Sequence, residues 1–385
     1  MPSTTVVSGV QYSGIWTMQQ VNSAVSAGTW PVIGPKLYFW GSNQYGKLGL
    51  GDTTNRSSPT QVGSLATWQT VKAGYFSSAV IKTDGTLWMW GNNNSGQLGL
   101  NNITDYSSPK QVGALTSWYK LACGFLVTLA IKTDGTLWSW GEGGQGCNGL
   151  NNTTDYSSPK QVGALTNWLN IACTYTNVAA VQTNGTLWTW GNNSYAGALG
   201  LGNLTSYSSP KQVGALTNWL SVACGVYRTA AIKTNGTLWA WGTNAYGELG
   251  LGNTTYYSSP KQVGALTNWS QVNIATNSTV AVKTDGTLWA WGYNITGQLG
   301  LGNTTNYSSP KQIGSLTIWS SADTGDGYAG ATQTNGTMWS WGKNNFGQLG
   351  LGNTTNYSSP KQIGSLAIWS NISTGYLSFG AVTAS

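Results

Sequence analysis

Glycines and a lysine stand in the spacing of a phosphate-binding loop at residues 41–48, GSNQYGKL. In such a loop, backbone amides cradle phosphate groups, the lysine pairs with them, and a following Ser or Thr hydroxyl binds magnesium. Here Leu48 follows Lys47, and no helical pattern comes after it. The sister copies of this stretch carry glutamine in place of the lysine, at Gln97, Gln298 and Gln348. The sequence therefore does not predict a nucleotide site.

Acid–base and metal chemistry have few candidate residues. The chain has 10 acidic residues and no histidine, so the commonest general base and metal ligand is missing. Asp323 and Asp326, in SADTGDGYAG, form the one close acidic pair, and they interrupt a regular repeat. They are a candidate site for that reason. Otherwise the sequence predicts a protein that is not an enzyme and that holds no metal or cofactor.

Three of the four cysteines share one register in successive repeats. Cys123, Cys173 and Cys224 each lie five residues after a tryptophan, whereas Cys147 stands alone in an irregular copy. Equivalent positions in neighbouring repeats need not face one another, so we expect small buried thiols and no disulfide framework.

The net charge of +7 rests on lysines that recur with the repeat. Six follow a Ser-Ser-Pro, at Lys110, Lys160, Lys211, Lys261, Lys311 and Lys361. Six tyrosines open the same stretch, at Tyr106, Tyr156, Tyr207, Tyr257, Tyr307 and Tyr357. In a closed ring these twelve residues would form a rim that meets an anionic or glycan surface, or a solvated rim with no partner. We expect no nucleic-acid binding, because no reading element accompanies the lysines.

A repeat of fifty residues positions all of these side chains. Trp-Gly pairs recur at a spacing of 50, and once of 51, at Trp40, Trp90, Trp140, Trp190, Trp241, Trp291 and Trp341. Within one unit, AVIKTDGTLWMWG (79–91) has two β-rich runs around Asp-Gly, which accepts the positive φ angles of a two-residue hairpin turn. Two more short runs, PKQVGAL and a Trp-led segment such as WLSVACG (219–225), complete four strands per repeat.

Four short strands per repeat predict the blade of a β-propeller, and seven copies predict seven blades. The first copy begins at PKLYFWG (35–41) without its preceding strand, and FGAVTAS (379–385) aligns with the strand that is missing. We therefore expect an all-β seven-bladed propeller over residues 35–385, with a C-terminal strand closing the first blade. The small residues of the ACG segment suit the strand nearest the axis. Residues 1–34 form a separate segment.

The stretch TLWAWGYNITGQLGLGN (287–303), with VACG upstream, resembles the repeat of the regulator of chromosome condensation family. The resemblance covers residues 35–385 and implies a seven-bladed propeller. A member of that family exchanges nucleotide on the small GTPase Ran. This chain has no wedge-like insertion, and the family's histidine after Cys-Gly is replaced by Arg228 and, elsewhere, by residues such as Ser77 and Thr128. We therefore do not expect Ran exchange or chromatin binding.

The N-terminal segment resembles virion structural proteins of tailed bacteriophages through SGIWTMQQVNSAVSAGTWP (13–31). Its apolar residues fall along one face of a short amphipathic helix. We interpret it as a helical or extended anchor to other virion proteins, with candidate anchor residues Ile15, Trp16, Met18, Val21, Val25 and Trp30.

The leading hypothesis from sequence is a non-enzymatic structural or adhesion protein of a phage virion, located on a tail fibre, tail tip or capsid. Its rim loops would bind a host-surface glycan or protein, or neighbouring subunits of an oligomeric assembly. The alternative is a soluble protein-binding propeller that inhibits or regulates an enzyme, since a similar ring serves as a β-lactamase inhibitor. The N-terminus lacks the basic start and apolar core of a signal peptide, and no stretch approaches the ~18 apolar residues of a membrane span.

Overall fold

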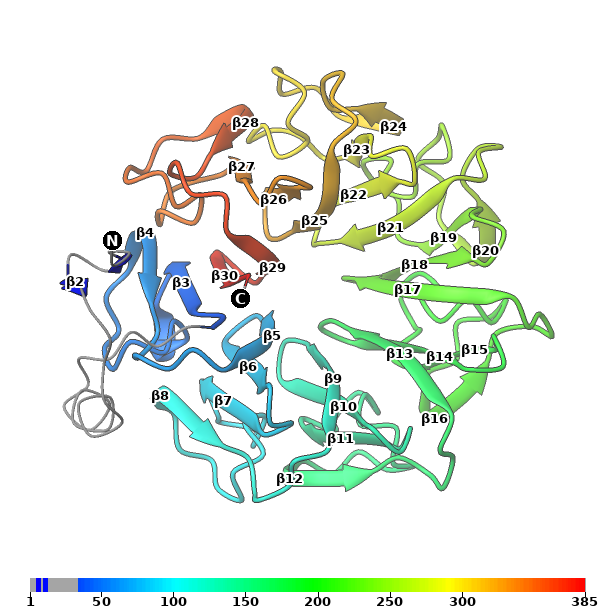
Figure 1. The fold of residues 1–385 in the computed structure, drawn as a ribbon. Coiled ribbons are helices and arrows are strands. Elements are labelled where there is room, and N and C mark those ends of the chain that lie inside the picture. The colour runs from blue at the N-terminus through cyan, green and yellow to red at the C-terminus, as the bar shows by residue number, and fades with distance from the viewer. Residues whose placement is uncertain (1–4, 8–9, 13–33, 385) are drawn as a thin grey trace.

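The computed structural model describes residues 5–7, 10–12 and 34–384, and places seven four-stranded sheets around a central axis (Figure 1). Near the N-terminus, β1 (Thr5–Val7) pairs antiparallel with β2 (Val10–Tyr12). The expected helix within 13–31 and the six candidate anchor residues lie outside the described residues. The prediction of an all-β, seven-bladed propeller is confirmed.

Each blade contains four antiparallel strands, and the strand order runs from the axis outwards. Blade 1 contains β29 (Trp369–Thr374), β30 (Ser378–Thr383), β3 (Leu37–Gly41) and β4 (Arg56–Gln61). Blade 2 contains β5 (Trp68–Ala73), β6 (Ser77–Lys82), β7 (Leu87–Gly91) and β8 (Tyr106–Gln111). Blade 3 contains β9 (Trp118–Cys123), β10 (Val127–Lys132), β11 (Leu137–Gly141) and β12 (Tyr156–Gln161). Blade 4 contains β13 (Trp168–Cys173), β14 (Asn177–Gln182), β15 (Leu187–Gly191) and β16 (Tyr207–Gln212).

The remaining blades follow the same pattern. Blade 5 contains β17 (Trp219–Gly225), β18 (Arg228–Lys233), β19 (Leu238–Gly242) and β20 (Tyr257–Gln262). Blade 6 contains β21 (Trp269–Ile274), β22 (Ser278–Lys283), β23 (Leu288–Gly292) and β24 (Tyr307–Gln312). Blade 7 contains β25 (Trp319–Thr324), β26 (Tyr328–Gln333), β27 (Met338–Gly342) and β28 (Tyr357–Gln362). A short 3-10 turn, η1 (Gln44–Gly46), lies in the loop after β3.

The Asp-Gly and Asn-Gly dipeptides do join the second and third strands, but the predicted two-residue turn is wrong. In blade 2 the backbone N–H of Gly85 donates to the carbonyl of Lys82, and the N–H of Lys82 donates to the carbonyl of Thr86. Three residues therefore form the loop, and its last residue, Gly85, has a φ of 77°. Asp84 instead accepts from the backbone and hydroxyl of Thr86, at 2.9 and 2.6 Å. A turn followed by a left-handed glycine is the usual three-residue hairpin.

The Trp-Gly tryptophans hold each blade to the one before it. Trp90 is fully buried, and its Nε1 donates to the carbonyl of Lys47 in blade 1 at 2.9 Å. Gly49 lies against the same indole, with a φ of 75°, and a Cβ there would lie 2.7 Å from Nε1 of Trp90. The equivalent bond recurs at each junction, from Trp40, Trp90, Trp140, Trp190, Trp241, Trp291 and Trp341. Tryptophan and glycine thus recur together because each junction needs both.

Blade 1 is built from both ends of the sequence, as predicted. Strand β30 pairs antiparallel with β3, so that Trp40 lies opposite Phe379, and the two rings stack with centroids 4.9 Å apart. The structure adds that β29 also belongs to this blade, so two strands rather than one complete it. Figure 1 shows the red strands beside the blue ones, which closes the ring.

The antiparallel strands give the propeller two distinct faces. The turn face carries the turns between first and second strands and the long loops after the third strands; the N–H of Asn92, at the start of such a loop, donates to the carbonyl of Phe76 in such a turn. The hairpin face carries the hairpins between second and third strands and the connectors between blades. There the N–H of Trp118 donates to the carbonyl of Gly85.

Candidate functional site

The turn face carries residues that differ from blade to blade. The outer strands repeat Tyr-Ser-Ser-Pro almost unchanged, but the turns between first and second strands do not repeat. From blade 1 to blade 7, their equivalent residues are Tyr376, Tyr75, Phe125, Tyr175, Val226, Thr276 and Asp326. All seven line a cavity of about 370 Å³ on the propeller axis. The packing of near-identical blades does not require these turns to differ. Their variation around one cavity therefore makes these positions the candidate site.

Four of these residues form an aromatic arc, defined as Tyr376, Tyr75, Phe125 and Tyr175. The rings of Tyr376 and Tyr75 stack with centroids 3.8 Å apart, and each further neighbouring pair lies 4.5 Å apart. Phe76 also packs against Tyr75 and Phe125, with ring centroids 4.8 and 4.9 Å apart. Tyr175, at one end of the arc, is 43% exposed. The arc is thus a continuous aromatic surface around part of the cavity mouth.

The backbone fixes the arc in place. The N–H of Tyr75 donates to the carbonyl of Gly124, and the N–H of Phe125 donates to that of Thr174, at 3.3 and 3.2 Å. The N–H of Tyr376 donates in the same way to Gly74 at 3.3 Å. Each turn is therefore tied to the turn of the next blade, so the arc is preorganised rather than loose.

Lys47, the lysine of the phosphate-loop spacing, is fully buried beside the arc. Its Nζ donates to the carbonyl of Tyr75 at 3.2 Å and to the carbonyl of Tyr376, and it lies 5.6 Å from the ring centroid of Tyr376. Burial lowers the pKa of this lysine to about 7. The lysine supports the two turns from within and is not available to a phosphate. The sequence prediction against a nucleotide site stays a prediction.

The two candidate aspartates do not form a pair. Asp323 lies in β25 and lines the axial cavity, and its carboxylate accepts from the N–H of Thr324 and of Thr374, both at 2.9 Å. Burial raises its pKa, although Lys72 and these hydrogen bonds oppose the shift. Asp326 lies in the turn that follows and forms an ion pair with Lys343 at 3.7 Å. Each carboxylate therefore has its own structural partners.

Polar residues of other innermost strands bond to the backbone of neighbouring blades in the same way. The Nδ2 of Asn273 donates to the carbonyl of Ala322 at 2.7 Å, and the Oε1 of Gln271 accepts from the N–H of Ala322 at 3.1 Å. Lys120 donates across to the carbonyl of Leu169 at 2.8 Å. These side chains satisfy the inner edges of the blades, which would otherwise leave backbone groups unpaired.

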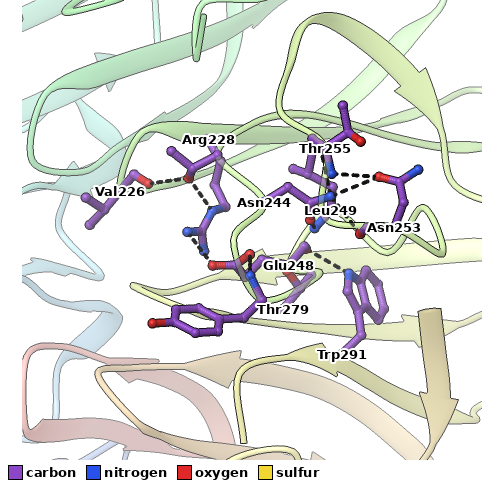
Figure 2. Close-up of polar contacts among 11 residues, drawn as sticks. Val226, Arg228, Asn244, Glu248, Leu249, Asn253, Thr255, Thr279 and Trp291 are labelled. Carbon is purple, nitrogen blue, oxygen red and sulfur yellow. Dashed lines mark hydrogen bonds and ion pairs between the residues drawn. The ribbon is translucent and has the colours of Figure 1, made fainter. Parts of the chain in front are cut away.

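A buried ion pair breaks the repeat in blade 5 (Figure 2). Arg228 and Glu248 are 3% and 1% exposed, and their Nη2 and Oε1 atoms lie 3.0 Å apart. The Nε of Arg228 donates to the hydroxyl of Thr243 at 3.1 Å, and the other carboxylate oxygen of Glu248 accepts from the N–H of Tyr246 at 2.8 Å. The backbone carbonyl of Glu248 also accepts from Trp291, so the pair sits within an interblade junction.

The register corrects one alignment made from sequence. Arg228 pairs with Gly242 as Val127 pairs with Gly141. The residue of blade 3 equivalent to Arg228 is therefore Val127, and not Thr128. Ser77 does occupy the equivalent position in blade 2, where it pairs with Gly91.

The predicted rim residues lie on the outer strands of six blades, and the structure pairs them within each strand. The Nζ of Lys110 lies 5.3 Å from the ring centroid of Tyr106, and the other five pairs have the same arrangement. The hydroxyl of Tyr106 also accepts from Asn102 at 3.3 Å. In blade 1 the corresponding strand has Arg56 and Thr60 instead. Rim binding stays a prediction.

Burial keeps the four cysteine thiols protonated, and a protonated thiol is a poor nucleophile. Burial raises the pKa of Cys123, Cys147 and Cys224 to about 12, and all four cysteines are free. Among the described residues, no three His, Cys, Asp or Glu side chains gather as a metal site would require. Within the same residues, no helix is long and apolar enough to cross a membrane.

Sequence reasoning missed the aromatic arc, the burial of Lys47 and the Arg228–Glu248 pair. The signal that could have found them is the exception to the repeat. Aligning the seven copies and setting aside what they share leaves the turn residues, and it also leaves Lys47, Arg228 and Glu248. Sequence reasoning instead selected the side chains that recur.

Comparison with known proteins places this geometry among related folds. Human WBSCR16 has a TM-score of 0.81 at 20% identity, and the match covers 92% of this chain and 100% of that one. Prp20p from Saccharomyces cerevisiae, in a study of its binding to Gsp1p and histones, has a TM-score of 0.80 at 18% identity. That match covers 91% of this chain and 92% of the yeast chain. Yeast RCC1 (Prp20) bound to Kap60 has a TM-score of 0.81 at 17% identity, and the match covers 91% of this chain and 89% of that one. At these identities the likeness shows the fold alone.

A search of curated protein sequences gave no match. The model of the regulator of chromosome condensation (RCC1) repeat matches seven segments, at residues 36–81, 84–131, 134–181, 184–232, 235–282, 285–331 and 335–378. A second model of that repeat matches residues 68–97 and 219–248. These segments cover most of the sequence and follow the seven blades, so the chain belongs to the regulator of chromosome condensation (RCC1) repeat family.

Proposed function

We propose that this chain is a protein-binding propeller that regulates or inhibits its partner, and that it binds that partner through the aromatic arc on the turn face. The observation that carries the proposal is the arc itself: four aromatic residues in adjacent turns contact one another in sequence around one cavity, whereas the outer strands repeat. The role is binding rather than catalysis, because Asp323 and Asp326 each have a structural partner of their own.

The chemistry of the arc suits a protein partner. Tyrosine and other aromatic side chains are enriched where protein interfaces bury most of their energy, because they are large, rigid and amphipathic. The arc is tied in place by backbone hydrogen bonds, so little conformational entropy is lost on binding. Tyr175 offers an exposed ring at one end, and Val226 continues the apolar surface in the next turn.

The relatives support this role over the virion role. The yeast relative is described by its binding to Gsp1p and histones, and in another structure it is bound to Kap60. The structural relatives named above are human and yeast proteins. The virion anchor and the host-surface ligand stay predictions from sequence.

Affinity capture with the full chain tests the proposal. The bait variant Phe125→Ala/Tyr175→Ala removes half of the arc, and the matched control Tyr207→Ala/Tyr257→Ala removes two rings from the outer strands. We expect the wild type and the control to retain one stoichiometric partner. Because central aromatic residues contribute about 2 kcal/mol or more each, the arc variant should bind at least about 100-fold more weakly.

Circular dichroism and the melting temperature of both variants establish that the fold is intact. The proposal fails if the arc variant retains the partner, or if the chain recovers other copies of itself and structural proteins of a particle instead of a single partner. The second result would return the virion role to first place.

A further inference from the structure

The hairpin face carries a ring of exposed leucines that the proposed function does not use. Each leucine lies in the connector between two blades, and each is 46–56% exposed. They are Leu65, Leu115, Leu165, Leu216, Leu266, Leu316 and Leu366. Because the connectors are equivalent and the ring is closed, the seven side chains lie at one level around the axis. Single exposed leucines are ordinary, whereas a complete ring on one face of a disc is a surface.

Lysines accompany the leucines at the same end of the blades. An exposed lysine lies five residues before the leucine in six of the seven blades, as Lys110 does before Leu115. These six residues are the lysine ring. In the sheet register Lys110 lies opposite Met89, one residue from the hairpin-face end of β8. Its Nζ lies over the ring of Tyr106 in the same strand, so this exposed side chain has to turn from that ring to reach a headgroup at the hairpin face. Four further lysines end the second strands at this face, but they are buried over tryptophan rings, at Lys82, Lys132, Lys233 and Lys283. The acidic residues of this face are the hairpin residues Asp84, Asp134 and Asp285.

The turn face has the opposite balance of charge. Its loops and turns carry Asp52, Asp105, Glu142, Asp155, Glu248 and Asp326, against the basic residues Lys47, Arg56 and Lys343. Lys47 is buried, and Glu248 is neutralised by Arg228, so the exposed balance of this face is acidic. The chain's positive charge is therefore concentrated on the face that also exposes the leucines. A charge separation of this kind orients a protein as it approaches an anionic surface.

Apolar grooves at the circumference extend the leucine ring between blades. One cavity of about 400 Å³ is lined by Leu366, Pro59 and Trp369, and another of about 360 Å³ by the equivalent residues Leu316, Pro360 and Trp319. The buried Nε1 atoms of these two tryptophans have no hydrogen-bond partner among the residues that the structure describes. The five equivalent tryptophans share this feature, at Trp68, Trp118, Trp168, Trp219 and Trp269.

We propose that the hairpin face docks on the surface of an anionic lipid bilayer, with the leucine ring entering the interface and the lysine ring meeting the headgroups. Peripheral binding of this kind combines exposed apolar side chains with lysines that reach anionic headgroups. A nucleic acid would satisfy the lysines but leave the leucines in water. A second copy of the chain, face to face, would bring two lysine rings together. The lipid surface is the one partner that suits both rings.

Vesicle sedimentation with the purified full chain tests this docking without any protein partner, so its outcome is independent of the proposed function. The vesicles contain phosphatidylcholine alone or phosphatidylcholine with phosphatidylserine. We expect binding to the mixed vesicles that weakens as salt is raised, and little binding to phosphatidylcholine alone. Each lysine near an anionic surface contributes about 1 kcal/mol, or about fivefold, so Lys160→Gln/Lys211→Gln/Lys261→Gln should weaken binding by about 100-fold.

A second variant separates lipid docking from charge attraction alone. Leu165→Ser/Leu216→Ser/Leu266→Ser changes side chains that are half exposed, so the fold should survive, and it should reduce vesicle binding at least tenfold. The arc variant Phe125→Ala/Tyr175→Ala, on the other face, should bind vesicles as the wild type does. The proposal is overturned if no serine-lipid-dependent binding occurs, or if the leucine variant binds as well as the wild type. It is also overturned if the wild type binds duplex DNA but not the mixed vesicles, or if the leucines mediate self-association instead.

Discussion

Replacing Glu248 with glutamine should destabilise the protein by about 3–5 kcal/mol, the usual cost of breaking a buried ion pair on one side. The substitution keeps the size of the side chain, and its amide oxygen can still accept from the N–H of Tyr246. Arg228, however, stays buried at 3% exposure with no opposing charge, and its Nη1 already has no partner among the described residues. A chain of 385 residues has an unfolding entropy of about 0.8 kcal/mol/K near its melting temperature. The melting temperature should therefore fall by about 4–6 °C.

The sister blades supply the control. Blade 2 has Ser77 and Gln97 at the two positions, and blade 6 has Ser278 and Gln298. The double variant Arg228→Ser/Glu248→Gln should therefore recover most of the stability that Glu248→Gln loses, because it removes the stranded charge. Urea denaturation followed by tryptophan fluorescence measures both variants, with calorimetry for the melting temperature. The reasoning is refuted if Glu248→Gln lies within 1 kcal/mol of the wild type, or if the double variant is no more stable than the single one.

Two other predictions concern pH and backbone strain. Between pH 7 and the ordinary lysine pKa of 10.5, the unfolded chain binds more protons at Lys47 than the folded chain, so stability should rise with pH by up to about 1.4 kcal/mol per unit. Lys47→Gln, which copies the sister blades, should remove that slope in denaturation measured across this range, and a slope unchanged by the variant would contradict the assignment. Gly300→Ala should cost several kcal/mol, because its φ is 71° and the new Cβ would lie 2.8 Å from Nε1 of Trp341. Gly314→Ala, at a φ of 61° with nothing within 4 Å, should cost about 1–2 kcal/mol, and equal losses for the two would show that the contact with Trp341 is unimportant.

The fold could be predicted from sequence because each of its requirements recurs seven times. The Trp-Gly pair appears in every unit because each junction buries an indole against a glycine. Closure could be predicted because the strand missing before Leu37 has its counterpart at Ser378–Thr383. The hairpin turn was mistaken because Asp84-Gly85 is compatible with two loop lengths, and the hydrogen bonds of Lys82 decide between them.

The candidate site could not be predicted in the same way, because it depends on which turns become neighbours. Tyr376 and Tyr75 are about three hundred residues apart in sequence, yet their rings stack because ring closure places blade 1 beside blade 2. Lys47 has the appearance of a phosphate-binding lysine in sequence, and only its position under two turns shows that it is buried. The rim lysines and tyrosines were conspicuous because they repeat, although each lysine lies over the tyrosine of its own strand.

The arrangement of blade 1 also determines when the protein can finish folding on the ribosome. Strands β3 and β4 precede the other strands of the propeller along the chain, but their inner neighbours β29 and β30 follow all six other blades. Until residues 369–383 leave the exit tunnel, β3 presents a bare edge, and Trp40 lacks the ring of Phe379. A growing chain therefore carries an incomplete first blade while the six other blades are synthesised, and a chaperone that shields the edge of β3 would act where premature pairing with another nascent chain can begin.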